Sequence, residues 1–284
     1  TPVEELRVQY RTASTVISSR CDGIRASQRI FVPQRDPVQV WTVELENTGE
    51  TPRTLSVFAA TQFAFQDLLV DVHSDLGGVY AYAYDSKGEN TRDRAFLCVT
   101  SHHAASTGHR EDLLLAPLDL SAPSLLEGRD LQNVNGYGFH AAGGVQAKMT
   151  LEPGARGRLD FLLGHAPSLE KAIELRESYT PSRIDSLLEE VASEEDRRAG
   201  AFSVDTGHPN LDAVINHFAK KQMTVYLVKK SGYRDNLQVC YALAMADEPL
   251  AETALLRALA AQYPAGRAPH CFRPLTGPDL QRSD

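Results

Sequence analysis

The densest group of chemically versatile side chains lies in Gly232-Tyr-Arg-Asp-Asn-Leu-Gln238, where a glycine leads into a run with helical apolar spacing. Arg234, Asp235 and Gln238 are three or four positions apart, so the first turns of a helix would present them on one side. A planar cation, a carboxylate and an amide together match the donors and acceptors of sugar hydroxyl groups. The same residues also fit a structural role, in which Asp235 complements the helix dipole and Arg234 forms a surface ion pair.

A second group lies in His270-Cys-Phe-Arg-Pro-Leu-Thr276, which is followed by Asp279, Arg282 and Asp284. The segment has no helical or strand periodicity and is predicted to be a loop. Loops that carry His, Arg and Asp beside an aromatic residue often deliver side chains to a cleft held by the scaffold. A solvated surface loop has the same composition, so the sequence leaves both interpretations open.

Metal chemistry is not indicated by the sequence. His102 and His103 are adjacent, but no carboxylate or third histidine follows at ligand spacing, so a surface loop is the simpler interpretation. The cysteines lie far apart and form no CxxC pair, which predicts reduced, buried thiols at Cys21, Cys98, Cys240 and Cys271. We therefore expect neither a metal site nor a disulfide framework.

The elements that position these groups change along the chain. Residues up to about Ala166 alternate as β-strands, with strands predicted at 24–32, 38–45 and 53–58 in an antiparallel meander. A later antiparallel pair is predicted at 145–151 and 157–163, joined by the turn Glu152-Pro-Gly154. The segment 85–135, rich in His, Ser, Gly and Asp, is expected to be mainly loops with short strands. Many strands separated by Gly and Pro suggest a sandwich.

After Pro167 the apolar period becomes that of a helix. Ser168 is a predicted N-cap, Thr180-Pro181 marks a second helix start, and these two helices are expected to form a connector. Three amphipathic helices are predicted next, with apolar faces Leu211/Val214/Ile215/Phe218, Leu237/Cys240/Tyr241/Ala244 and Leu250/Ala254/Leu255/Ala258/Leu259. Three helices cannot close a large helical domain, so we expect more of this domain than the chain contains.

Composition restricts the class of partner. The 284 residues carry 29 Lys and Arg against 37 Asp and Glu, a net charge of −8, and 42% of them are hydrophobic. No apolar run approaches the roughly 18–20 residues that span a bilayer. The basic residues are scattered, which argues against a nucleic-acid surface. We expect a cytoplasmic protein with a small-molecule partner, no nucleic acid and no membrane.

Four segments together resemble one family. Asp22-Gly-Ile-Arg-Ala-Ser-Gln-Arg-Ile-Phe-Val-Pro33, Val38-Gln-Val-Trp-Thr-Val-Glu-Leu-Glu-Asn47, Ser231-Gly-Tyr-Arg-Asp-Asn-Leu-Gln238 and Pro269-His-Cys-Phe-Arg-Pro-Leu275 resemble the glycoside phosphorylases of glycoside hydrolase family 94. The resemblance implies a multidomain β plus α protein with an N-terminal antiparallel β-sandwich, a helical linker and the beginning of a six-fold α/α barrel. The corresponding ranges are 1–166, 167–205 and 206–284, with the first and last incomplete, so that this fragment is expected to be inactive alone.

The resemblance also implies a reaction. Family members split a β-glucosyl disaccharide by phosphorolysis with inversion, which needs one catalytic acid, inorganic phosphate and no organic cofactor or metal. By resemblance, Asp284 in Ser283-Asp284 is the general acid, and the substrate-binding residues are Arg234, Asp235, Gln238, His270 and Arg273. Many relatives carry a second Asp where this chain has Val239, and the phosphate-binding residues are expected beyond residue 284.

Two alternatives remain open from the sequence, an inverting glycoside hydrolase on the same scaffold and a non-catalytic carbohydrate-binding module of a larger protein. A hydrolase would need a second carboxylate to activate water. The expected partners are a disaccharide and phosphate, and a homodimer is a possible assembly.

Overall fold

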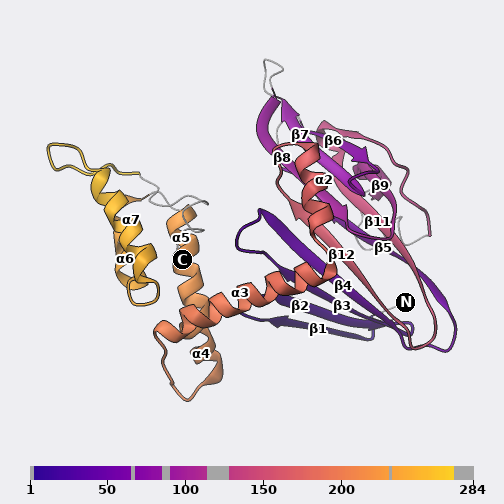
Figure 1. Cartoon of the computed structure of the whole chain (residues 1–284), viewed down its shortest axis with the longest axis horizontal. Coiled ribbons are helices and arrows are strands. Elements are labelled where there is room, and N and C mark those ends of the chain that lie inside the picture. Colours follow the sequence, from indigo (N-terminus) through magenta and orange to yellow (C-terminus); the bar gives the residue numbers. More distant parts are fainter. Residues whose placement is uncertain (1–2, 65–67, 85–89, 114–127, 230–231, 272–284) are drawn as a thin grey trace. The chain divides into compact units, whose positions relative to one another are not determined.

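The computed structural model describes residues 3–64, 68–84, 90–113, 128–229 and 232–271 (Figure 1). The chain divides into two compact units, residues 1–188 and 189–284. The first unit contains the strands and the second contains only helices among its named elements. The order, antiparallel strands followed by helices, is the one predicted from the sequence.

Strands occupy most of the first unit. Their bounds are β1 (Glu5–Tyr10), β2 (Thr15–Cys21), β3 (Ile24–Phe31), β4 (Val38–Asn47), β5 (Arg53–Thr61), β6 (Leu68–His73), β7 (Gly78–Tyr84), β8 (Asn90–Val99), β9 (His103–His109), β10 (Gly136–Tyr137), β11 (Ala141–Leu151) and β12 (Arg156–Gly164). In the described residues they form a nine-stranded sheet, β1-β2-β3-β4-β12-β8-β7-β6-β10, and a three-stranded sheet, β5-β11-β9. Every pairing within these sheets is antiparallel.

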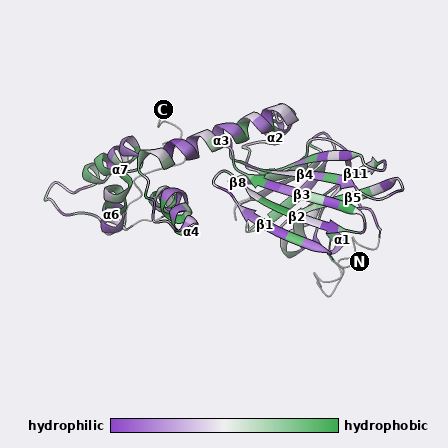
Figure 2. Ribbon diagram, turned by 90° about the horizontal axis from the view of Figure 1, so that it is seen from below, coloured by the Kyte–Doolittle hydropathy of each residue, from purple (hydrophilic) through white to green (hydrophobic). Residues whose placement is uncertain are grey.

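Side chains from both sheets form one core. Val79, Leu97 and Leu159 of the nine-stranded sheet are fully buried in the same cluster as Val145 of the three-stranded sheet. Figure 2 shows hydrophobic and hydrophilic residues along the strands, in keeping with the alternation that predicted them. The arrangement is sandwich-like, as expected.

The predicted strand pairing was wrong at two places. β4 was expected to continue the meander into β5, but β4 pairs with β12, whereas β5 pairs with β11 in the other sheet. The predicted hairpin of β11 and β12 fails for the same reason, because these strands lie in different sheets. The two short connections are therefore arches between sheets, and not hairpins within one sheet.

Asn47 joins the two arches. Its side chain is fully buried, and its amide Nδ2 donates to the carbonyl oxygens of Thr51 at 2.8 Å and Leu151 at 2.9 Å. Its Oδ1 accepts from the backbone N–H of Gly49 at 3.0 Å. One side chain thus satisfies polar backbone groups of both arches, and the carbonyl of Leu151 among them is buried.

Replacing Asn47 by alanine is expected to lower the free energy of unfolding of the sandwich by about 2–4 kcal/mol, because buried backbone groups lose their partners. Urea unfolding followed by circular dichroism measures the loss. The control is Thr48→Ala, because Thr48 is exposed and its hydroxyl makes a single hydrogen bond, to the Gly23 carbonyl at 2.8 Å. Equal losses in the two variants would contradict a special role for Asn47.

Two helices follow the sandwich in the segment predicted to be a connector, α2 (Leu169–Ser178) and α3 (Pro181–Ala201). Ser168 is the N-cap of α2, and its hydroxyl accepts from the Lys171 N–H at 3.3 Å, as expected. In the C-terminal part of α2, Arg176 donates to the carbonyl oxygens of Val99 at 3.3 Å and Thr100 at 3.1 Å, which attaches α2 to the end of β8. The boundary between the two compact units falls within α3.

Ion pairs attach the start of α3 to the nine-stranded sheet. Asp185 accepts from Arg158 at 2.8 Å and from Arg29 at 3.0 Å. Arg158 also pairs with the buried carboxylate of Asp160 at 2.9 Å, which accepts from the Thr42 hydroxyl at 2.7 Å. The hydrogen bond from Arg158 holds the pKa of Asp185 below its usual range. The network therefore loses attraction as acid protonates Asp185.

The second unit continues α3 with α4 (Pro209–Ala213), a π-helical turn η3 (Val214–Phe218), α5 (Ala219–Lys229), α6 (Tyr233–Leu243) and α7 (Glu248–Ala260). Lys220 donates to the Ala199 carbonyl at 2.9 Å and to that of Phe202, so it caps the C-terminal end of α3. Asp247 is the N-cap of α7. Leu227, Leu243 and Ala254 are buried together in the core of this unit.

The predicted apolar faces of these helices were only partly correct. On α6, Tyr233, Asn236, Cys240 and Leu243 are buried, whereas Tyr241 is 83% exposed. On α7, Leu250, Ala251, Ala254 and Ala258 are buried, whereas Leu255 and Leu259 are exposed. The helices bury the side that contacts their neighbours within this unit, and they leave apolar residues exposed on the other side.

The segment 85–135 contains more regular structure than predicted. The long strand β8 and strand β9 lie there, followed by the short helix α1 (Arg110–Leu113). His103, predicted to lie on a surface loop, starts β9 and its Nε2 lies 2.7 Å from the Ser106 hydroxyl. Burial lowers the pKa of His103, and the charge of Arg176 lowers it further. His102 is exposed and has a φ of 57°, which fits a turn.

Candidate functional site

The first candidate cluster lies at the start of α6. Gly232 is the extended N-cap residue, with φ −71° and ψ 121°. A Cβ atom at this position would lie 2.4 Å from Oδ2 of Asp235, so a larger residue would displace the carboxylate from its present position. The backbone angles of Gly232 are ordinary, and its lack of a side chain matters only for where the Asp235 carboxylate lies.

The polar side chains expected to act together are exposed on the first turns of α6. Arg234 Nη2 lies 3.4 Å from Asp235 Oδ1, and their side chains are 86% and 43% exposed. Gln238 is also exposed. The three side chains are thus accessible to a ligand. This exposure is compatible with sugar binding and also with the structural role at the helix N-terminus. The Arg234–Asp235 pair is too exposed to contribute much to stability.

The structure joins the second candidate cluster to the first. Gly232 forms an isolated antiparallel bridge with Cys271, and the Tyr233 N–H donates to the His270 carbonyl at 3.1 Å. The exposed side chains of His270 and Cys271 lie together, with Nδ1 3.4 Å from Sγ. Residues 270 and 271 therefore lie against Gly232 and Tyr233, which directly precede Arg234 in the chain. Arg273 and Asp284, also predicted as site residues, lie outside the described residues.

Tyr233 lies within the predicted cluster, but no role was predicted for its side chain. Its ring is buried and its hydroxyl donates to the Ala258 carbonyl at 2.9 Å, near the end of α7. Tyr233 thus connects α6, α7 and the 270–271 segment. Its spacing from Asn236, Cys240 and Leu243 is the helical signal that could have identified it, because those four residues form the buried face of α6.

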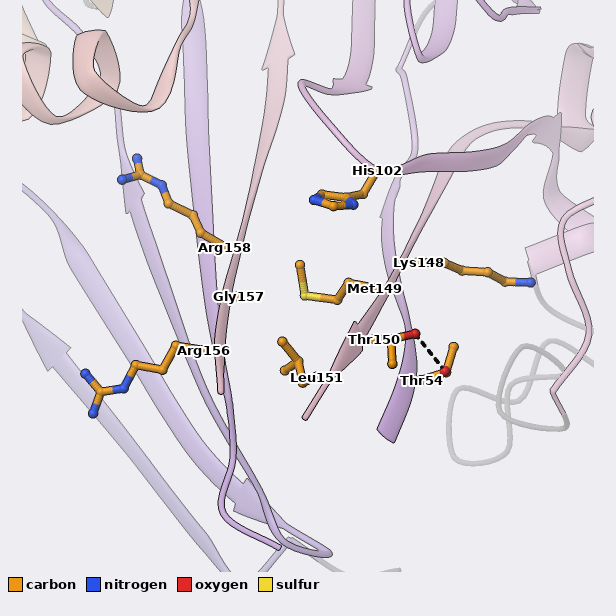
Figure 3. Close-up of a pocket in the computed structure, with 9 residues that line it drawn as sticks. All are labelled: Thr54, His102, Lys148, Met149, Thr150, Leu151, Arg156, Gly157 and Arg158. Carbon is orange, nitrogen blue, oxygen red and sulfur yellow. Dashed lines mark hydrogen bonds between the residues drawn. The ribbon is translucent and has the colours of Figure 1, made fainter. Parts of the chain in front are cut away.

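A cavity of about 410 Å³ in the first unit is a weaker candidate for an anionic ligand. Figure 3 shows His102, Met149 and Leu151 pointing into it, whereas Lys148, Arg156 and Arg158 point away. Lys148 pairs with Asp130 at 2.6 Å and Arg156 with Glu46 at 3.2 Å, outside the cavity. The cationic side chains are therefore paired with carboxylates outside the cavity, and they are not directed at an anion bound inside it.

None of the four cysteines, all of which lie in the described residues, forms a disulfide, and two of them are buried. Burial raises the pKa of the Cys98 thiol to about 12, so Cys98 is not a nucleophile near neutral pH. Cys240 is also buried, whereas Cys21 is half-buried and Cys271 is exposed. The expectation of buried thiols was wrong for Cys21 and Cys271, because Cys21 ends a strand near the sheet edge and Cys271 lies in an exposed segment.

The same order of sandwich and helices occurs in a solved structure of a bacterial glucoamylase complexed with acarbose. The TM-score is 0.51 at 8% sequence identity, and the match covers 95% of this chain and 43% of the glucoamylase. This likeness concerns the fold alone.

No described helix is long and apolar enough to cross a membrane.

The sequence of the sandwich shows which family the chain belongs to. The model of the glycosyl hydrolase 94 supersandwich domain matches residues 1–182, and the chain belongs to this family. The chain is 24% identical to an N,N'-diacetylchitobiose phosphorylase of Vibrio furnissii, over 96% of this chain and 37% of the relative. It is 24% identical to a 3-O-beta-D-glucopyranosyl-beta-D-glucuronide phosphorylase of Paenibacillus borealis, over 90% of this chain and 36% of the relative.

A third relative is the cellobionic acid phosphorylase of Neurospora crassa, 23% identical over 91% of this chain and 35% of the relative. The chain thus spans little more than a third of the length of these curated relatives. The resemblance read from the sequence is confirmed at the level of the family.

Proposed function

We propose that the complete protein is an inverting glycoside phosphorylase, which splits a β-glucosyl disaccharide with inorganic phosphate and releases glucose 1-phosphate and an acceptor sugar. The observation that carries this proposal is the alignment of nearly the whole chain, sandwich and helices, with relatives named as disaccharide phosphorylases. The accessible Arg234–Asp235 pair beside the 270–271 segment supports it, because these residues offer fixed donors and acceptors to a sugar.

The proposed reaction needs one protonated carboxyl group. Asp284 donates its proton to the glycosidic oxygen while the bond from that oxygen to the anomeric carbon breaks. A phosphate oxygen forms the new bond from the opposite face, so a β-glucoside gives an α-configured sugar phosphate. Arg234, Asp235 and Gln238 hold the glucosyl unit, and His270 and Arg273 contact the substrate from the loop. The proposed reaction uses no organic cofactor.

We also propose that 206–284 is the beginning of an α/α barrel, preceded by a linker at 167–205 and a sandwich at 1–166. Large apolar side chains of the second unit support the assignment, because they are exposed in this chain and would be covered by further helices. They are Leu211 (46%), Val214 (50%), Tyr241 (83%), Met245 (58%), Leu256 (57%) and Leu259 (50%). The 284-residue chain alone is then expected to be inactive.

The test uses the complete protein in the synthetic direction. Purified protein is incubated with glucose 1-phosphate and each of glucose, N-acetylglucosamine, gluconate and glucuronate, and release of phosphate is followed by ³¹P NMR. The two acids are included because two relatives carry an acidic sugar in their names. Phosphate release that depends on one acceptor, with formation of a disaccharide, supports the proposal.

The other outcomes distinguish the alternatives. Cleavage of the disaccharide at an equal rate with and without phosphate would identify a hydrolase, and release of the α-anomer from the β-glucoside would show that it inverts. Binding of the disaccharide with no turnover in either direction would identify a carbohydrate-binding module. Either result would overturn the proposed phosphorolysis.

A further inference from the structure

Three potential metal ligands gather at one end of the three-stranded sheet, far in sequence from the substrate cluster. His109 ends β9, Glu111 lies in α1, and His140 ends the 3₁₀ turn η2 (Gly138–His140). One ligand atom from each residue lies within 4.8 Å of the other two. His140 Nδ1 and Glu111 Oε1 are 3.2 Å apart, and the two imidazole rings are stacked with centroids 5.5 Å apart.

The backbone that carries these residues is closely packed. His109 is paired with Ala141, the residue after His140, in the β9–β11 ladder. Gly108 donates its N–H to the Val134 carbonyl at 2.7 Å, and a Cβ at Gly136 would lie 1.6 Å from the Gly108 oxygen. Two strands can approach this closely only with glycine at both positions. The two histidines are therefore placed side by side by the sheet, and not by a loose loop.

The donor set matches one class of cation. We propose that His109, Glu111 and His140 bind a Zn²⁺ ion, with the fourth position open to solvent. Two imidazoles and one carboxylate are a common zinc set, with bonds of about 2.0–2.2 Å. Ligand atoms of such a tetrahedron are about 3.3–3.5 Å apart, close to the spacing of His140 and Glu111. Calcium and magnesium prefer oxygen ligands and fit this set poorly.

The two stacked rings are parallel to within 5° and do not both direct a lone pair at one ion as they stand, so binding requires one ring to turn. His140 and Glu111 are 62% and 56% exposed, which leaves their side chains room to rotate. The neighbouring Asp112 is not a ligand, because its Oδ2 accepts from the Gln132 N–H at 2.8 Å. The cation would fasten the end of β9 to the start of β11. This site is independent of the reaction proposed above.

The test measures zinc itself. The purified protein is freed of metal with a chelator and titrated with Zn²⁺ by isothermal calorimetry, and its thermal unfolding is followed with and without zinc. We expect one tight equivalent, and a rise in Tm of the sandwich of roughly 5–10 °C at about 100 times the Kd. Substitution of Co²⁺ should give the visible absorption of a four-coordinate site.

Two variants each remove one proposed ligand, and a third variant serves as a matched control. His140→Ala and Glu111→Gln should each abolish the tight equivalent and the rise in Tm while leaving the circular dichroism spectrum unchanged. The control is His102→Asn, which removes another exposed imidazole and suits the positive φ at that position. It should bind zinc like the parent protein. Absence of tight binding in the parent, or equal binding by His140→Ala, would overturn the site.

Discussion

Replacing Asp284 by asparagine in the complete protein is expected to slow phosphorolysis by roughly 10²–10⁴-fold, the usual contribution of a general acid. Asparagine keeps the shape of the side chain but has no proton to give, so the glycosidic oxygen would have to leave as an alkoxide. The rate is measured as kcat for release of sugar 1-phosphate from the natural disaccharide at saturating phosphate.

A substrate and a second variant test this assignment. Glucosyl fluoride has a leaving group that needs little protonation, so the loss caused by Asp284→Asn should shrink with it. Asp279→Asn removes another carboxylate from the same segment and should retain near-normal turnover of the disaccharide. Near-normal turnover by Asp284→Asn would instead mean that a different carboxylate is the acid.

Replacing Asp235 by alanine is expected to lower kcat/KM by roughly 30- to 1,000-fold, equivalent to about 2–4 kcal/mol. The carboxylate is expected to accept a hydrogen bond from a glucosyl hydroxyl, and its loss leaves that hydroxyl unpaired in the closed complex. Its carboxylate lies over Gly232 at the start of α6, a helix that Tyr233 attaches to α7, and its side chain is accessible to a sugar. Steady-state kinetics with the disaccharide and phosphate measures the change.

The structural role of Asp235 is separated by a matched variant. Glu248 is an exposed acidic residue in the first turn of α7, as Asp235 is in α6. Each substitution by alanine removes a favourable charge at a helix N-terminus and should cost about 0.3–1 kcal/mol of stability. Only Asp235→Ala should change kcat/KM. Similar losses of stability with unchanged kinetics in both variants would leave Asp235 with a structural role alone.

Local pattern was enough to find most elements. The alternation in 24–32 and 38–45 predicted β3 and β4 because each strand has one face in the core and successive side chains point to opposite faces. Ser168 and Thr180-Pro181 predicted the starts of α2 and α3 because caps satisfy backbone groups that the helix itself leaves unpaired. These signals depend on neighbours in the sequence, so the sequence contains them completely.

Strand partners were not contained in that pattern. A short turn after β4 is compatible with a hairpin or with an arch, and the local residues do not distinguish the two. The arch is favoured by contacts made across more than 100 residues, such as the hydrogen bond from Asn47 to Leu151. The orientation of α6 was missed for a similar reason, since the side it buries is selected by α5 and α7.

The sequence by itself determined which residue types could act on a sugar, because Arg234, Asp235 and Gln238 are neighbours on one helix. Only the tertiary structure decided what lies beside them, since Gly232 and Cys271 are separated in the chain by α6 and α7 and meet in the fold. The cluster of His109, Glu111 and His140 also depends on the tertiary structure. His109 and His140 are far apart in the chain, and they meet because β9 pairs with β11, which places His109 opposite Ala141, the residue after His140.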